Sequence, residues 1–144
     1  MDHARIDVGL RYARETIQQQ LRFKLLADYR FAIPPGAPAH RVAASRTLEC
    51  DAIVIGLFTH MHPRGRDMTF RAHAPNSQPE TLLVVPNYNF DWQIPYRWAA
   101  GAKRFPKGTK LEAIAHYDNS AFNPYNPDPA ATVRNGQQSH EEMM

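Results

Sequence analysis

Short stretches of alternating apolar and polar residues, separated by turn-forming residues, recur along the whole chain. Residues 110–117 are an example, because a period of two is typical of a β-strand with one buried face. Twelve prolines and seven glycines interrupt the alternation, and no strong helical period appears. The pattern predicts an all-β protein, an antiparallel jelly-roll β-sandwich of about eight or nine strands with little helix. Residues 1–144 are long enough for one such domain.

Seven predicted strands have clear limits. They cover residues 6–12, 21–33, 40–49, 52–58, 68–72, 81–85 and 110–117. The strand at 68–72 is expected to fold back on the strand at 52–58 as its hairpin partner, because a Pro-Arg-Gly turn lies between them. The Pro-rich residues 34–38 and the Asn- and Pro-rich residues 118–130 are expected to form loops.

Charge and hydropathy argue against two classes of partner. The chain has 17 basic and 14 acidic residues and a net charge of +3, and its longest basic cluster is Lys103-Arg104. Nucleic-acid binding usually needs a concentrated basic face, so no nucleic-acid partner is expected. No apolar stretch reaches the roughly 18 residues of a membrane span, so no membrane-spanning segment is expected.

The cysteine count and the N-terminus bear on the compartment. Cys50 is the only cysteine, so no intrachain disulfide can form. Residues 1–5 lack the apolar core of a signal peptide. We therefore expect either a protein that stays inside the cell or a piece of a longer chain whose leader lies elsewhere.

The apolar run at 52–58 leads directly into His60-Met61-His62. Side chains two apart on a strand point the same way, so the two imidazoles would lie side by side at the end of a rigid element. Two neutral imidazoles held in parallel form a bidentate metal clamp. The alternative is that these are two surface histidines at a strand end, and the spacing alone leaves both interpretations open.

A metal clamp of this kind needs at least one more ligand. His116 lies on the predicted strand 110–117, and Met143 and Met144 follow two glutamates in the last residues. A thioether is a soft ligand that selects reduced copper over zinc, magnesium or calcium. A blue-copper site is not expected, because Cys50 has no neighbouring histidine and methionine in the required arrangement.

A cupin-like metal enzyme is a second interpretation, because cupins are jelly rolls with a His-x-His pair. In cupins a Gly stands six positions before the first His and a Glu follows the pair. Here Gly56 is too close to His60, and Asp67 is the nearest carboxylate that follows. The second cupin element matches only Pro106-Lys107-Gly108, with His116 too far behind it. The spacing therefore disfavours a cupin.

Residues 87–98 contain five aromatic side chains. Such a segment can form a ligand-stacking surface, but in a small β-domain it more often packs into the core. We therefore expect these rings, Trp92 and Trp98 among them, to be mainly buried.

Several motifs together resemble one bacterial protein family. They are Leu57-Phe58-Thr59-His60-Met61-His62-Pro63-Arg64-Gly65-Arg66, Val85-Pro86-Asn87-Tyr88-Asn89-Phe90-Asp91-Trp92-Gln93, Pro106-Lys107-Gly108-Thr109, Ala115-His116-Tyr117-Asp118-Asn119-Ser120, Asn126-Pro127-Asp128-Pro129 and Glu141-Glu142-Met143-Met144. This family is related to the C-terminal domain of copper type II, ascorbate-dependent monooxygenases, the group of peptidylglycine α-hydroxylating monooxygenase and dopamine β-monooxygenase. The resemblance covers residues 51–144 and, more weakly, the strands before them.

The resemblance implies a jelly roll that holds one dioxygen-binding copper through His60, His62 and Met143. Met144 is the alternative if the register differs by one residue, and His116 matches no ligand, so it is expected in the second shell or the core. The implied reaction is hydroxylation of a C–H bond in a small-molecule or peptide-like substrate. Ascorbate would supply electrons through a second copper-binding domain, in cis or in trans. The family also implies a periplasmic or secreted location.

The chain departs from the family pattern in three respects. The partner copper domain is absent from these 144 residues, Cys50 alone cannot form the disulfides of the animal enzymes, and the sequence stops at the methionine. We therefore expect a domain truncated at its C-terminal strand, and turnover by the isolated chain is an open question. The alternative is a non-catalytic jelly-roll module, for binding or structure, within a larger exported protein.

Overall fold

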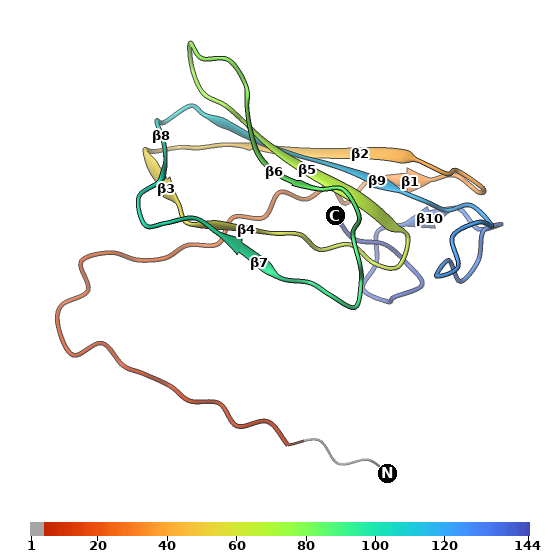
Figure 1. Ribbon diagram of the computed structural model, residues 1–144, viewed down its shortest axis with the longest axis horizontal. Helices are drawn as coiled ribbons and strands as arrows, with labels where there is room; N and C mark the ends of the chain where they lie inside the picture. Colours follow the sequence, from red (N-terminus) through yellow and green to blue (C-terminus); the bar gives the residue numbers. More distant parts are fainter. Residues whose placement is uncertain (1–4) are drawn as a thin grey trace.

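The chain forms antiparallel β-strands joined by irregular loops, as Figure 1 shows for the computed structural model. The structure describes residues 5–144; residues 1–4, which belong to the predicted domain, lie outside that range. The strands are β1 (Ala32–Ile33), β2 (His40–Thr47), β3 (Ala52–Val54), β4 (Gly56–Phe58), β5 (Gly65–His73), β6 (Glu80–Val85), β7 (Pro95–Arg97), β8 (Lys103–Phe105), β9 (Lys110–Tyr117) and β10 (Val133–Arg134). None of residues 5–144 is helical, so the all-β antiparallel prediction is confirmed.

The largest sheet contains four strands in the order β2-β9-β5-β6. In β9 the buried residues are every second one, from Leu111 to Tyr117, and the residues between them are partly exposed. That period of two is the expected property of a strand with one face on the core. The strands predicted at 40–49, 81–85 and 110–117 are confirmed as β2, β6 and β9.

A second layer consists of two short ribbons, β3-β8 and β4-β7; in the view of Figure 1, β4-β7 lies below the sheet and β3-β8 stands at its left edge. The predicted strand 52–58 is confirmed as β3 and β4, which are interrupted at Ile55. The Ile55 carbonyl still accepts a hydrogen bond from the Trp98 amide at 3.1 Å. Val54 and Phe105 of this layer pack in one cluster with Ala72 and Leu111 of the sheet, so the two layers share an apolar core.

The strand predicted at 68–72 exists as β5, but its predicted partner is wrong. β5 pairs with β9 and β6, and not with the strand at 52–58. The chain between Phe58 and Gly65 crosses from the second layer to the sheet. This crossing lets both apolar strands face the core from opposite sides, whereas a hairpin would leave them in one layer.

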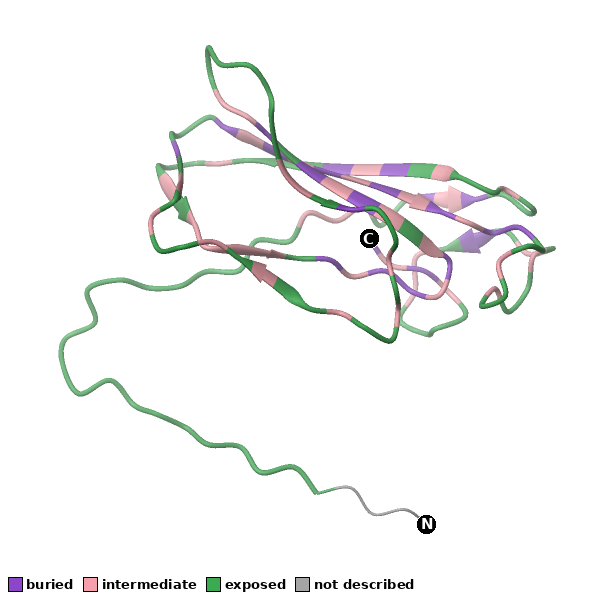
Figure 2. Cartoon of the chain, in the orientation of Figure 1, coloured by how far each residue is buried: buried purple, intermediate pink, exposed green. Residues whose placement is uncertain are grey.

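The predicted strand at 6–12 is wrong, and of the strand predicted at 21–33 only the last two residues form β1. Residues 5–25 instead form an arm that leaves the body and is exposed along its length (Figures 1 and 2). Ile6 and Tyr12 are 84% and 83% exposed. Alternation gives these residues one apolar face, but a strand also needs partners for its N–H and C=O groups. No backbone hydrogen bond joins the arm to the rest of residues 5–144.

Removing residues 1–20 is expected to change the free energy of unfolding by less than about 0.5 kcal/mol, because residues 5–20 are exposed and such segments outside the core contribute little. Urea denaturation followed by tryptophan fluorescence measures this. Leu26→Ala is the positive control, because Leu26 packs against both core clusters, and a loss of about 1 kcal/mol or more is expected. A comparable loss on deleting residues 1–20 would show that the arm docks on the body.

Candidate metal centre

The histidine turn, residues 59–64, connects β4 to β5. We predicted His60 and His62 on a strand, but β4 ends at Phe58, opposite Pro95 of β7. Proline has no N–H to donate, and the chain before it leaves as a loop, so the ladder stops there. The alternation of the strand does not continue into the turn, because Met61 and His62 are both buried, and the Met61 side chain belongs to the core.

Tyr88 takes the place of a neighbouring strand for the backbone of Met61. Its hydroxyl oxygen accepts a hydrogen bond from the Met61 amide at 3.0 Å and donates one to the Met61 carbonyl at 2.6 Å. Burial raises the pKa of Tyr88 to about 12, which keeps the donating proton in place. Gly65 makes this packing possible, because a Cβ there would lie 2.6 Å from the Met61 Cβ.

Glu142 takes the same role for the next residues of the turn. Its two carboxylate oxygens accept hydrogen bonds from the amides of His62 and Arg64, at 2.8 and 2.7 Å. The side chain is fully buried. Burial raises the pKa of Glu142 to about 7, against the effect of these amides and of the Arg64 charge. The C-terminal segment is thereby held directly on the histidine turn.

Arg64 connects the turn to two further segments. Its buried guanidinium donates hydrogen bonds to Asn119 Oδ1 at 2.9 Å, to the His140 carbonyl at 2.8 Å and to the Asp128 carbonyl at 3.4 Å. The sequence pattern predicts Arg64 only as part of a turn. Nothing in the local pattern identifies it as buried, because its partners lie between 55 and 76 residues away.

The structure brings the two imidazoles together. The ring centroids of His60 and His62 are 5.3 Å apart, and the ring planes are nearly perpendicular at 87°. The Nδ1 atom of His60 lies 2.8 Å from Gln93 Oε1, and the Nδ1 atom of His62 lies 3.2 Å from the Glu141 carbonyl. Within residues 5–144, neither Nε2 atom makes a hydrogen bond to protein. Neither is a fully buried atom without a partner, as Asn135 Oδ1 is, so each Nε2 atom keeps some contact with solvent, although the Gln138 carbonyl also lies close to the His62 ring.

The surroundings of His62 favour the neutral imidazole. Its side chain is 4% exposed, and Phe90 packs edge-on against it with 5.9 Å between ring centroids. Burial lowers the pKa of His62, and nearby His60 lowers it further, while the carbonyls of Glu141 and Gln138 act in the opposite direction. Neutral imidazole is the form that binds metals.

The two C-terminal methionines have different surroundings. Met144 belongs to the buried core cluster, so its thioether is part of the packing. Met143 is half-buried, and its carbonyl accepts a hydrogen bond from the Tyr117 hydroxyl at 2.7 Å. Its neighbours Glu141 and Glu142 provide the hydrogen bonds that join this segment to His62. Of the two methionines, Met143 is therefore the one whose side chain is not part of the core cluster.

His116 does not lie in the core, one of the two places expected for it. It is on the outer face of β9, opposite to the buried residues of that strand. Its Nδ1 atom lies 2.7 Å from Asp67 Oδ1, and both side chains are partly exposed.

The expectation that the aromatic rings of residues 87–98 are mainly buried holds for four of them and fails for Trp92. None of the five rings is fully buried, and Trp92 is 74% exposed. Tyr88 and Phe90 contact the histidine turn instead of filling the centre of the core.

The donor set fits a soft metal better than a hard one. Within residues 5–144, no three His, Cys, Asp or Glu side chains gather in a way that could hold a metal ion. The Glu142 carboxylate is already occupied by two backbone amides, and Glu141 Oε2 accepts a hydrogen bond from the Gln138 amide. Two imidazoles with a thioether would suit reduced copper, whereas calcium and magnesium require several oxygen ligands.

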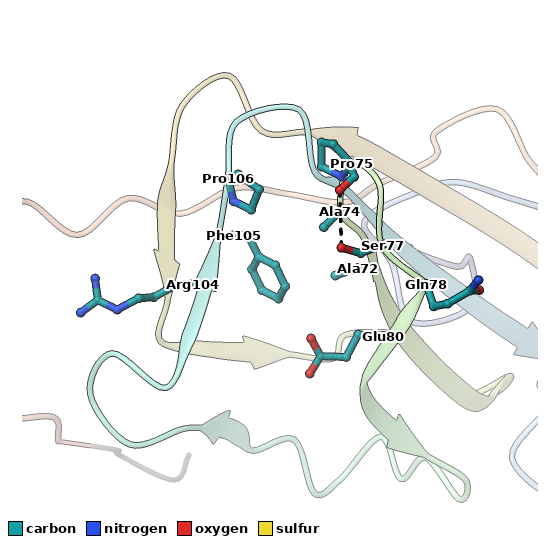
Figure 3. Close-up of a pocket in the computed structure, with 9 residues that line it drawn as sticks. All are labelled: Ala72, Ala74, Pro75, Ser77, Gln78, Glu80, Arg104, Phe105 and Pro106. Carbon is teal, nitrogen blue, oxygen red and sulfur yellow. Dashed lines mark hydrogen bonds between the residues drawn. The ribbon is translucent and has the colours of Figure 1, made fainter.

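A separate pocket of about 270 Å³ lies between the β5–β6 connection and β8 (Figure 3). Its lining residues are Ala72, Ala74, Pro75, Ser77, Gln78, Glu80, Arg104, Phe105 and Pro106. Ser77 donates a hydrogen bond to the Pro75 carbonyl, and Glu80 is paired with Lys103. These polar groups are therefore satisfied within the protein, and none of the histidine turn lines this pocket.

Comparisons with known proteins do not identify the chain: no protein-family model matches it, and no curated protein matches it significantly. No helix in the described part of the chain is long and apolar enough to cross a membrane.

Proposed function

We propose that His60 and His62 bind a single copper ion through their Nε2 atoms, with Met143 as a third ligand. The observation that supports this best is the pairing of the two rings: each Nδ1 atom is engaged by a protein oxygen, and neither Nε2 atom makes a hydrogen bond to a side chain or backbone group of residues 5–144. Metal-bound histidines typically use their second nitrogen in this way, with an outer hydrogen bond that orients the ring.

The chain would then be the oxygen-binding domain of a monooxygenase similar to the copper type II, ascorbate-dependent enzymes. Bound copper supplies the one-electron chemistry by which dioxygen hydroxylates a substrate C–H bond. The substrate class that we propose is a small or peptide-like molecule, and a second copper-binding domain, in cis or in trans, would deliver electrons. A periplasmic or secreted location goes with this proposal.

The protein's own residues have three roles in this proposal. His60 and His62 provide the nitrogen ligands, and Phe90 packs against His62 and helps to exclude water from it. Tyr88 and Glu142 hold the backbone of the turn, so that the two rings stay at a fixed separation. The two β-layers are compatible with a jelly-roll sandwich, the fold that we propose for the complete domain.

Titration of the protein with Cu(I) against a chromophoric chelator tests the proposal. We expect one copper per chain, a loss of affinity of about 100-fold or more for His60→Ala or His62→Ala, and about 10-fold for Met143→Ala. His116→Ala is the matched control and is expected to bind normally, because its ring pairs with Asp67 on the outer face of β9.

X-ray absorption of the Cu(I) protein tests the sulfur ligand separately. A copper–sulfur contribution that persists in Met143→Ala would exclude Met143. If the folded wild-type chain binds no copper at all, the non-catalytic binding or structural module is the better description.

A further inference from the structure

The Gln93 side-chain amide lies between the His60 ring and the Phe90 backbone carbonyl. Its Oε1 atom is 2.8 Å from His60 Nδ1, and its Nε2 atom donates a hydrogen bond to the Phe90 oxygen, also at 2.8 Å. Gln93 is half-buried, so water competes only in part for these bonds. The amide therefore links the His60 ring to the backbone of the loop that follows β6.

The Phe90 carbonyl determines which way the Gln93 amide points. A carbonyl oxygen only accepts hydrogen bonds, so the NH₂ end of the amide must face it. A flipped amide would place two oxygens 2.8 Å apart and lose the bond. With the NH₂ group at Phe90, the atom facing His60 is Oε1, which also only accepts.

The same chemistry then determines where His60 carries its proton. Neutral histidine exists as two tautomers, and the hydrogen bond made by one ring nitrogen selects between them. Because Gln93 Oε1 accepts, His60 Nδ1 must donate and therefore carries the hydrogen. The Nε2 atom of His60 is left with its lone pair free.

We propose that Gln93 is a positioning residue that holds His60 in the Nδ1–H tautomer, with Nε2 ready to bind a metal. The consequence for copper rests on the proposed function, but the tautomer itself is a property of the metal-free protein. His62 has the same Nδ1–H tautomer without help from another side chain, because the Glu141 backbone carbonyl accepts a hydrogen bond from its Nδ1 atom. Substitution of Gln93 should therefore release one imidazole and leave the other unchanged.

Two substitutions separate this role from general packing. Gln93→Met keeps the length of the side chain but removes the acceptor, so His60 is free to take either tautomer. Gln93→Glu loses the bond to Phe90 but keeps an acceptor facing His60, so the Nδ1–H tautomer should be restored. Tyr88 keeps its own two bonds to Met61 in both variants, so the turn should remain folded.

Two-bond proton–nitrogen NMR of the metal-free, ¹⁵N-labelled protein reports which ring nitrogen carries the proton. At mildly alkaline pH we expect Nδ1–H for His60 and His62 in the wild type and in Gln93→Glu. In Gln93→Met we expect His60 to become a mixture of tautomers while His62 is unchanged. A His60 ring that stays Nδ1–H in Gln93→Met, or that is Nε2–H in the wild type, overturns the proposal.

A Cu(I) titration of the same variants measures the consequence for binding. Gln93→Met is expected to bind copper about 10-fold more weakly than the wild type, and Gln93→Glu no more weakly than the wild type, as for outer hydrogen-bond partners in other metal sites. Equal affinities in Gln93→Met and the wild type would show that the tautomer does not limit binding, which also overturns the role of Gln93. A wild-type protein that shows the NMR pattern but binds no copper contradicts the proposed function and leaves the tautomer assignment intact.

Discussion

Arg64→Met is expected to lower the free energy of unfolding by about 3–5 kcal/mol, because three acceptors each lose a hydrogen bond from a charged donor, at about 1–3 kcal/mol each. The guanidinium is 1% exposed and bonds to three separate segments of the chain. Methionine fills much of the volume but donates none of these bonds. It also removes the positive charge that compensates the buried Glu142 carboxylate. Urea denaturation monitored by tryptophan fluorescence measures the loss.

Arg66→Met is the matched control, because Arg66 is exposed two residues further along the chain. Its guanidinium reaches only the Pro38 carbonyl, at 3.2 Å. We expect a change within about 0.5 kcal/mol, as for other surface substitutions. Equal effects at the two positions would mean that Arg64 is not the link between the turn, the 118–130 loop and the C-terminal segment.

Glu142→Gln is expected to cost about 2–3 kcal/mol of stability, although it changes little in shape. The carboxylate accepts one backbone amide on each oxygen, from His62 and from Arg64. Glutamine has one accepting oxygen, so its NH₂ group must face one of these two donors. One buried amide then loses its partner. The loosened turn should also bind Cu(I) more weakly, measured by the same chelator competition.

Glu141→Gln controls for the loss of a negative charge next to the turn. Glu141 contacts His62 through its backbone carbonyl, which the substitution keeps. We expect nearly wild-type stability and copper affinity. In addition, the double variant Arg64→Met with Glu142→Gln should lose less than the sum of the single losses, because the two groups share one network. Additive losses would falsify the coupling.

The strands that sequence analysis identified correctly are those with both a period of two and a place inside the body. β9 is an example: its buried residues are the ones that the alternation predicts. Residues 6–12 have an equally clear alternation, but in the structure they have no neighbouring strand. Periodicity records which residues suit a strand, whereas a strand also requires a hydrogen-bonding neighbour, which a single sequence does not specify.

The candidate site was predictable only in its local part. The spacing of His60 and His62 predicts that their rings are close, and the structure places them together. The side chains that hold them come from residues 27 to 80 positions away, such as Tyr88 and Glu142. No local pattern connects residues so far apart, so the supporting network became visible only in three dimensions.

The Glu142 contacts also have a consequence for the order of folding. They span 78 and 80 residues of chain, so closing this loop is among the entropically expensive steps. Contacts of such high sequence separation tend to form after the local hairpins. The histidine turn would therefore become rigid late, at about the stage of the β2–β9 pairing, in which His40 and Tyr117 are 77 residues apart, and once residue 142 has docked. A copper ion held at this turn would stabilise the native state after the transition state for folding has been passed. It should therefore slow unfolding more than it speeds folding.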